Sequence, residues 1–86
     1  MAPTRFAVTV EVQLRAGIAD PQGATIERAL PALGVEGVRA VRAGKSFRFE
    51  VTADDRDEAA ARARLVADRL LANPVIEESS VTVSGG

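Results

Sequence analysis

The side chains that proteins most often use as general bases and nucleophiles are almost missing from this chain. Histidine, cysteine, tyrosine and tryptophan do not occur, and Lys45 is the single lysine. Acid–base or nucleophilic chemistry would therefore depend on Asp, Glu, Ser and Thr. Without cysteine the chain has neither a disulfide nor a thiolate metal site. This inventory disfavours an enzyme, and we expect the chain to carry no catalytic residue, bind no cofactor and hold no metal ion.

One short motif could suggest nucleotide chemistry. Residues Ala43–Ser46 match the end of a phosphate-binding P-loop, but that motif needs a glycine five residues before Gly44, where this chain has Arg39. A P-loop also joins a strand to a helix, whereas these residues are predicted to join two strands. We interpret them as a hairpin turn in which Gly44 adopts a positive φ.

Two further patterns have simpler structural explanations. The segment Lys45–Val51 is weakly similar to the aromatic strand of RNA-recognition domains, but the chain has only three phenylalanines and its core needs Phe47 and Phe49. The acidic run Asp54–Glu58 lacks the spacing of an EF-hand loop and is typical of a helix start. With a net charge of −1 and interspersed signs, the chain is not expected to bind nucleic acid.

The length of 86 residues predicts one domain over 1–86 with a thin core, since a chain this short removes only about 60 to 65% of its unfolded surface from water. Small domains of this kind often add burial by pairing with a copy of themselves or with a larger partner. The longest apolar runs are a few residues long, and the N-terminus lacks a signal-peptide pattern. We therefore expect no membrane association and a cytoplasmic location.

The first half of the chain predicts a strand and a helix. Phe6–Leu14 alternates apolar and polar residues as a half-buried strand does. Asp20 and Pro21 form a helix start, with an acceptor at the N-cap and a proline at the first helical position. The helical spacing of the apolar residues then predicts that one face packs on the core, with Gly34 ending the helix; these residues are Ile26, Ala29, Leu30 and Leu33.

The middle of the chain predicts a hairpin formed by strands Val38–Arg42 and Phe47–Thr52. A second helix follows over Asp54–Ala72, with Asp55 and Glu58 spaced as a capping box. Its predicted core-facing stripe contains Ala59, Ala63, Val66, Ala67 and Leu70. Leu65 lies on the solvent flank of this helix, where it is either one partly exposed leucine or a contact with a partner.

A final strand is predicted over Val75–Val83, because Pro74 ends the preceding helix. A slip in its alternation predicts a bend near Glu78–Ser80. The resulting order, β-α-β-β-α-β, predicts an α+β fold of ferredoxin-like type, a four-stranded antiparallel sheet with both helices on one face. Both edges of that sheet are open, so we expect a homodimer or a higher oligomer such as a homotetramer.

Three blocks together resemble the family of PurS subunits of phosphoribosylformylglycinamidine synthase. They are DPQG at 20–23, VRAGK at 41–45 and LLANPVIE at 70–77. The resemblance covers most of the chain. In the family an aromatic residue often follows shortly after the VIE, whereas Glu78, Ser79 and Ser80 stand there in this chain.

This resemblance implies a role in the fourth step of de novo purine synthesis. In that step a glutaminase subunit releases ammonia, and a synthetase subunit uses ATP and Mg²⁺ to form the amidine. The PurS-like partner bridges these two subunits as a dimer and assists ammonia transfer. By resemblance, the expected subunit contacts are Asp20, Gln22, Gly23, Arg42, Gly44, Lys45, Asn73, Pro74, Ile76 and Glu77, with Leu65 as a further candidate.

Other interpretations stay open on the sequence alone. Several matching residues, notably Gly23, Gly44 and Pro74, could serve backbone geometry instead of contacts. The whole chain could also be a small-molecule-sensing regulatory domain of ferredoxin-like topology. A cofactor-free isomerase of dimeric α+β type is a third possibility, which the missing His, Tyr and Cys disfavour.

Overall fold

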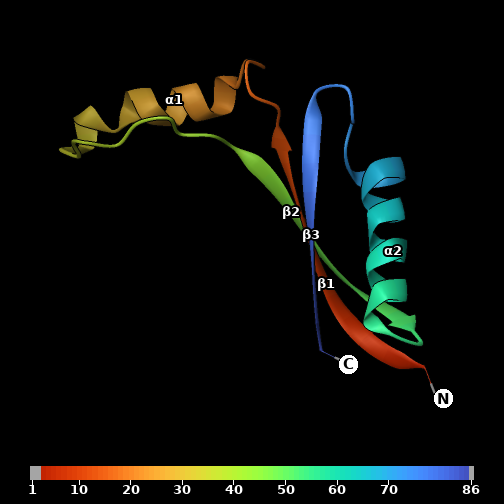
Figure 1. Cartoon of the computed structure of the whole chain (residues 1–86). Coiled ribbons are helices and arrows are strands. Elements are labelled where there is room, and N and C mark those ends of the chain that lie inside the picture. Colours follow the sequence, from red (N-terminus) through yellow and green to blue (C-terminus); the bar gives the residue numbers. More distant parts are fainter. Residues whose placement is uncertain (1–2, 86) are drawn as a thin grey trace.

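A computed structural model of the chain describes residues 3–85 and shows a twisted antiparallel sheet, one helix packed on it and another helix standing clear of it (Figure 1). The three strands are arranged in the order β2-β1-β3. The α+β class is confirmed, but the predicted fourth strand is not part of the sheet. Along the chain the elements are β1 (Thr4–Leu14), α1 (Pro21–Ala29), a 3-10 turn (Pro31–Leu33), β2 (Gly44–Ala53), α2 (Arg56–Val66), a π-helical turn (Ala67–Leu71) and β3 (Glu77–Gly85).

β1 is the central strand, and its alternation builds the core as predicted. Val10 lies opposite Phe47 of β2 and Val81 of β3. Its neighbours on the same face of β1 are also buried, whereas the polar residues between them face the other side of the sheet. The fully buried side chains of largest volume are Val8, Val10 and Val12.

α2 packs on this apolar face through small residues. Ala59, Ala63 and Ala67 are fully buried, and alanine lets a helix approach a sheet closely. The helix begins at the predicted N-cap, where the Asp55 carboxylate accepts a hydrogen bond of 2.8 Å from the Glu58 N–H. Glu58 also forms an ion pair with Arg62, four residues later on the same helix.

The last turn of this helical segment differs from the predicted stripe. Residues Ala67–Leu71 form a π turn, closed by a bond of 2.9 Å from the Ala72 N–H to the Ala67 oxygen. A π turn contains about one residue more than an α turn, so it changes which side chain points at the core. Leu71 packs against the core, whereas Leu70, predicted to be buried, is 79% exposed.

Residues 15–43, which we call the arm, leave the sheet where β1 ends and β2 begins (Figure 1). The prediction that both helices cover one face of the sheet is therefore wrong for α1, which lies along the extended residues before β2. Ile26 and Leu33, predicted to face the core, are 45% and 73% exposed. Gly34 ends the 3-10 turn with φ 77°, in agreement with its predicted role.

The predicted hairpin at Ala43–Ser46 does not form. Residues 38–43 continue the line of β2, and β2 pairs with β1 from Gly44 to Ala53. Gly44 is not among the residues with positive φ; Ala40, with φ 56°, is. Contacts between separate segments of the arm hold this course straight, because carboxylates from the α1 side accept the N–H groups of Val41 and Ala43 and hold this segment along α1.

β3 starts two residues later than predicted and is regular. Glu77 lies opposite Leu14 of β1, and pairing continues without a bend through Glu78–Ser80. Within residues 3–85, the outer edges of β2 and β3 pair with no other strand; the open edge of β3 agrees with the prediction, whereas that of β2 is open because the predicted fourth strand is missing. In the same part of the chain, no helix has the length and apolar character required to cross a membrane.

Candidate functional site

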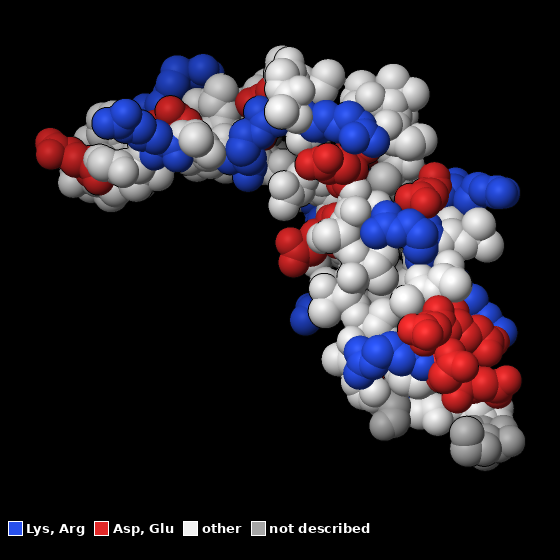
Figure 2. Space-filling view, viewed as in Figure 1, with Lys and Arg blue, Asp and Glu red and all other residues white. Residues whose placement is uncertain are grey.

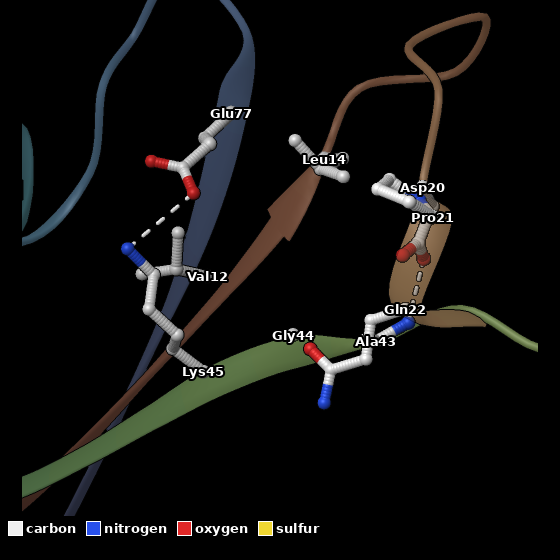
Figure 3. A pocket seen from close by; sticks show the side chains of 9 residues that line it. All are labelled: Val12, Leu14, Asp20, Pro21, Gln22, Ala43, Gly44, Lys45 and Glu77. Carbon is white, nitrogen blue, oxygen red and sulfur yellow. Dashed lines mark hydrogen bonds and ion pairs between the residues drawn. The ribbon is translucent and has the colours of Figure 1, made fainter. Parts of the chain in front are cut away.

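The three sequence blocks meet where the arm joins the sheet. A hollow of about 280 Å³ lies there between the end of β1, the start of α1, the start of β2 and the start of β3 (Figure 3). Its lining residues come from all three blocks and from β1: Val12, Leu14, Asp20, Pro21, Gln22, Ala43, Gly44, Lys45 and Glu77. We call this the junction hollow.

At one wall of the junction hollow, Asp20 links two segments of the arm, the start of α1 and the residues before β2. One carboxylate oxygen accepts the Gly23 N–H at 2.9 Å and caps α1, and the other accepts the Ala43 N–H at 2.7 Å. The side chain is only 5% exposed, and the Arg42 guanidinium lies 3.9 Å away. The two backbone hydrogen bonds, helped by Arg42, hold the pKa of Asp20 below its ordinary value despite partial burial.

Two glycines allow the close packing that this arrangement needs. A Cβ on Gly23 would lie 2.3 Å from the Val41 carbonyl oxygen, so the extended segment could not approach α1 as it does. A Cβ on Gly44 would lie 2.7 Å from the Val12 carbonyl oxygen on β1. The backbone interpretation of these two glycines therefore has direct support, and for Gly44 the reason is close approach rather than a turn.

Glu77 and Lys45 close the opposite side of the junction hollow (Figure 3). The Lys45 ammonium lies 3.4 Å from the Glu77 carboxylate, whose side chain is 15% exposed. The other Glu77 oxygen accepts the Asn73 N–H at 2.7 Å. This bond, followed by the charge of Lys45, lowers the pKa of Glu77 although burial opposes the shift. The ion pair links β2 to β3 across the end of β1.

The Asn73–Glu77 turn is held by a residue far away in the sequence. The Arg15 guanidinium donates two hydrogen bonds, of 3.1 and 2.9 Å, to the Pro74 carbonyl oxygen, and the Arg15 N–H donates to the Ile76 oxygen. Asn73 completes the turn, since its side-chain oxygen accepts the Val75 N–H at 3.1 Å. The first residue of the arm thus fixes the loop that precedes β3.

The remaining predicted residues are distributed more widely. Gln22 lines the junction hollow, and Arg42 donates from the arm to the carbonyl oxygens of Ile18 and Arg15. Leu65 is 54% exposed on α2, away from the residues that line the hollow. Pro74 and Ile76 belong to the turn beside the hollow and do not line it.

Two residues that hold the junction were missed on the sequence. Arg15 bonds the turn at Pro74, and Glu27 accepts the Val41 N–H at 3.0 Å. Neither lies at a local spacing that predicts its partner, since Arg15 and Pro74 are far apart along the chain. Glu27 lies on α1, which was predicted from its apolar face. Its carboxylate accepts the Val41 N–H only because the extended segment lies against α1.

The side chains at the junction have a structural role, because they hold the arm and the strands in place. The Asp20 and Glu77 carboxylates already accept backbone N–H groups and face cations, so neither is placed as a free base. Across residues 3–85, no three His, Cys, Asp or Glu side chains are grouped in a way that could hold a metal ion. The junction therefore fixes the direction in which the arm leaves the sheet.

Charged side chains and exposed apolar side chains occupy different parts of the molecular surface. Figure 2 shows acidic side chains gathered around the start of α2 and basic ones along the arm, with both signs present in each region. Exposed large apolar residues gather in two places, on the arm and beyond the end of α2, and Leu65 lies apart from both, on α2. At the second place Leu70 and Val75 are both 79% exposed, beside the 36% exposed Ile76.

Comparisons with known proteins agree on one family. The family model described as PurS, phosphoribosylformylglycinamidine (FGAM) synthase, matches residues 7–85. A phosphoribosylformylglycinamidine synthase subunit PurS from Mycobacterium leprae is 47% identical over 75 residues, which cover 85% of this chain and 89% of the relative. The corresponding subunit from Thermotoga maritima is 38% identical over 76 residues, covering 88% and 93%.

Solved structures give the same result. A crystal structure of the Thermotoga maritima purS subunit matches with a TM-score of 0.89 and 35% identity, over 98% of this chain and 97% of that one. A chain in the structure of PurLQS from the same organism matches with a TM-score of 0.86 and 36% identity, over 93% and 98%.

Proposed function

This chain belongs to the PurS family of phosphoribosylformylglycinamidine synthase subunits, which act in purine biosynthesis, and from this we propose how it works in that complex. It is an accessory subunit without a catalytic centre of its own. It bridges a glutaminase subunit and a synthetase subunit and assists the transfer of ammonia between them. ATP and Mg²⁺ are used by the synthetase subunit, and this chain works in the cytoplasm as a homodimer or homotetramer.

One observation carries this proposal: residues of the three blocks that resemble the family hold the arm in a fixed position relative to the sheet. Asp20 is bonded to both α1 and the segment before β2, and Lys45 with Glu77 joins β2 to β3. A bridge between two larger proteins has to keep its contact surfaces at a set distance. The chain spans 57 Å along its longest axis and only 14 Å along its shortest, a shape suited to contacts at both ends.

Reconstitution with the glutaminase and synthetase subunits tests this function. Amidine formation is measured with glutamine and, separately, with ammonium salt, in the presence and absence of this chain. We expect the chain to raise the glutamine-dependent rate several-fold and to leave the ammonium-dependent rate far less changed. No effect on either rate would contradict the proposal.

A matched pair of variants separates the junction from general stability. Asp20→Ala and Asp55→Ala each remove an N-cap, which costs about 0.5 to 2 kcal/mol of stability, but only Asp20 also holds the arm. We expect Asp20→Ala to reduce the glutamine-dependent rate more than Asp55→Ala does, with both variants folded by circular dichroism. Equal losses would show that the junction has no special role.

A further inference from the structure

The outer edge of β3 is a regular strand edge that no other strand covers within residues 3–85. In an antiparallel strand, alternate residues direct both backbone groups at the neighbouring strand, and the residues between them direct both groups away from it. The bond from the Arg15 N–H to the Ile76 oxygen shows that the even-numbered residues here face β1. The N–H and carbonyl groups of Ser79, Val81 and Val83 therefore point outward from this edge.

The sequence of this edge favours pairing with another chain. Residues 79–84 read SSVTVS, without a charged residue or a proline and with three β-branched residues of high strand propensity. Short stretches of this composition are prone to add to strands of other chains when they lie at an edge. Proteins usually protect such edges with lysine, proline or a β-bulge, whereas the pairing of β3 with β1 is regular throughout. Protection of this edge has to come from another element.

Two arginines of α2 cover the outward carbonyl groups of β3. The helix lies beside this strand (Figure 1). Arg64 donates to the Ser79 carbonyl oxygen from both terminal nitrogens, at 3.4 and 3.3 Å, and to the Ser79 hydroxyl at 2.8 Å. Arg56 donates to the Val83 carbonyl oxygen and, at 3.5 Å, to that of Gly85. All three carbonyl groups belong to the outward-facing set.

The spacing of the two arginines matches the spacing of these carbonyl groups. Arg56 and Arg64 lie eight residues apart on α2, and eight residues of α-helix rise roughly 12 Å. Ser79 and Val83 lie four residues apart on β3, which corresponds to roughly 13 Å of strand. The later arginine bonds the earlier strand residue, so helix and strand run in opposite directions. One face of α2 thus follows the edge of β3 over most of its length.

Ordinary surface ion pairing does not explain these contacts. Arg56 forms no ion pair within residues 3–85, although acidic side chains gather around the start of α2 (Figure 2). Its guanidinium bonds the carbonyl groups of β3 instead. Arg64 does lie 3.3 Å from the Asp68 carboxylate, yet it also donates three hydrogen bonds to Ser79. Both side chains are therefore directed at the strand edge.

We propose that Arg56 and Arg64 close the outer edge of β3 to pairing with the β3 edge of a second copy of this chain. An incoming strand has to donate its N–H groups to the outward carbonyl groups, and the guanidinium groups compete for those of Ser79 and Val83. Hydrogen bonds from a charged donor are stronger than those from a neutral backbone N–H. This inference goes beyond the proposed function, because it concerns a surface that is kept out of contacts.

Two matched double variants of the full chain test this role. The edge variant is Arg56→Gln with Arg64→Gln, and the control variant is Arg62→Gln with Arg69→Gln. Glutamine is a good helix former, and its shorter side chain lacks the charge. Each variant removes two positive charges and one ion pair from the same helical segment. Within residues 3–85 neither control arginine bonds β3; Arg62 bonds the Thr52 oxygen of β2 instead.

Sedimentation velocity over a wide range of concentration measures the size of the assembly, and hydrogen exchange followed by NMR reports on the amides of Ser79, Val81 and Val83. In the original chain and the control variant we expect a size that reaches a plateau and fast exchange at these three amides. In the edge variant we expect the weight-average mass to reach about twice that plateau or more, since each copy gains a further pairing surface. The three amides should exchange at least about tenfold more slowly there, whereas a mere loss of stability would speed exchange.

Three results would overturn the proposal. The first is an edge variant with the mass and exchange rates of the original chain, and the second is equal growth of the control variant. The third is slow exchange of the three outward amides in the original chain, which would show that the edge is already paired. The single variants Arg56→Gln and Arg64→Gln provide the same test if circular dichroism shows that the edge variant is unfolded, because each uncovers one end of the edge. No other subunit is needed, so the result is independent of reconstitution.

Discussion

The junction glycine Gly23 makes a severe and measurable prediction. In Gly23→Ala the new Cβ would lie 2.3 Å from the Val41 carbonyl oxygen and 2.7 Å from a carboxylate oxygen of Asp20. Both distances are shorter than any real Cβ contact, so either the extended segment or the cap has to move. The first neighbour is backbone and cannot rotate away, which makes adjustment costly.

The expected magnitude follows from opposing effects. Overpacking of this kind costs about 1 to 3 kcal/mol, and displacing the Asp20 cap adds about 0.5 to 2 kcal/mol. Replacing glycine by alanine within a helix returns at most about 1 kcal/mol through helix propensity. We therefore expect Gly23→Ala to lower the free energy of unfolding by about 0.5 to 4 kcal/mol.

Urea denaturation followed by circular dichroism, at one fixed protein concentration, measures this change. Gln22→Ala is the matched control, since it lies one residue earlier on the exposed side of α1 and introduces no clash; it should change stability by less than about 0.5 kcal/mol. If Gly23→Ala were as stable as the original chain or more stable, the close approach of the segment to α1 would be refuted.

Three further predictions follow from the same contacts. Asp20 and Glu77 have lowered pKa values because their carboxylates accept hydrogen bonds from backbone N–H groups in the fold. The unfolded chain therefore binds more protons in acid than the folded chain does. The stabilising effect of the two carboxylates is complete above the unfolded pKa values and is lost as the pH falls from about 5 through the folded pKa values. Stability measured against pH should fall less steeply in Asp20→Asn and Glu77→Gln, and an unchanged slope in both would contradict this. Leu71→Ala should lower the free energy of unfolding by about 2 kcal/mol, near the lower end for a leucine in a core because Leu71 is only partly buried. Leu70→Ala should lower it by less than about 0.5 kcal/mol, because Leu70 is exposed. The reverse order in urea denaturation would show that the π turn is wrong. Arg15→Ala should cost about 1 kcal/mol and speed hydrogen exchange in the turn before β3, since two hydrogen bonds to the Pro74 oxygen are lost; unchanged exchange there would show that Arg15 does not hold the turn.

Local signals predicted much of this fold because they act within a few residues. The alternation of Phe6–Leu14 depends only on which face of a strand is buried, and it placed the central strand and the core correctly. The caps at Asp20 and Asp55 depend on side chains that reach backbone groups three residues away, so both helix starts were predictable. The resemblance carried by the three blocks identified the family, which the comparisons confirm.

The errors have physical causes outside the local sequence. Glycine, lysine and serine at Gly44–Ser46 are compatible with a tight turn, but carboxylates on the α1 side of the arm hold the preceding residues straight, and that choice depends on contacts between separate segments. Leu70 and Leu71 are equally apolar, so a helical stripe cannot show that one extra residue in a π turn sends Leu70 to the surface.

The sequence by itself determined the α+β class, the central strand and the two helix starts, since these follow from side-chain chemistry and short-range periodicity, and the resemblance of its three blocks identified the family. Tertiary structure alone decided that the arm stands clear of the sheet and that Asp20, Lys45 and Glu77 line one hollow. These three residues lie in separate parts of the chain, and no local rule places them together. Their meeting requires the end of β1 and the starts of β2 and β3 to lie at a common point, which is set by strand register and by the bonds that fix the arm.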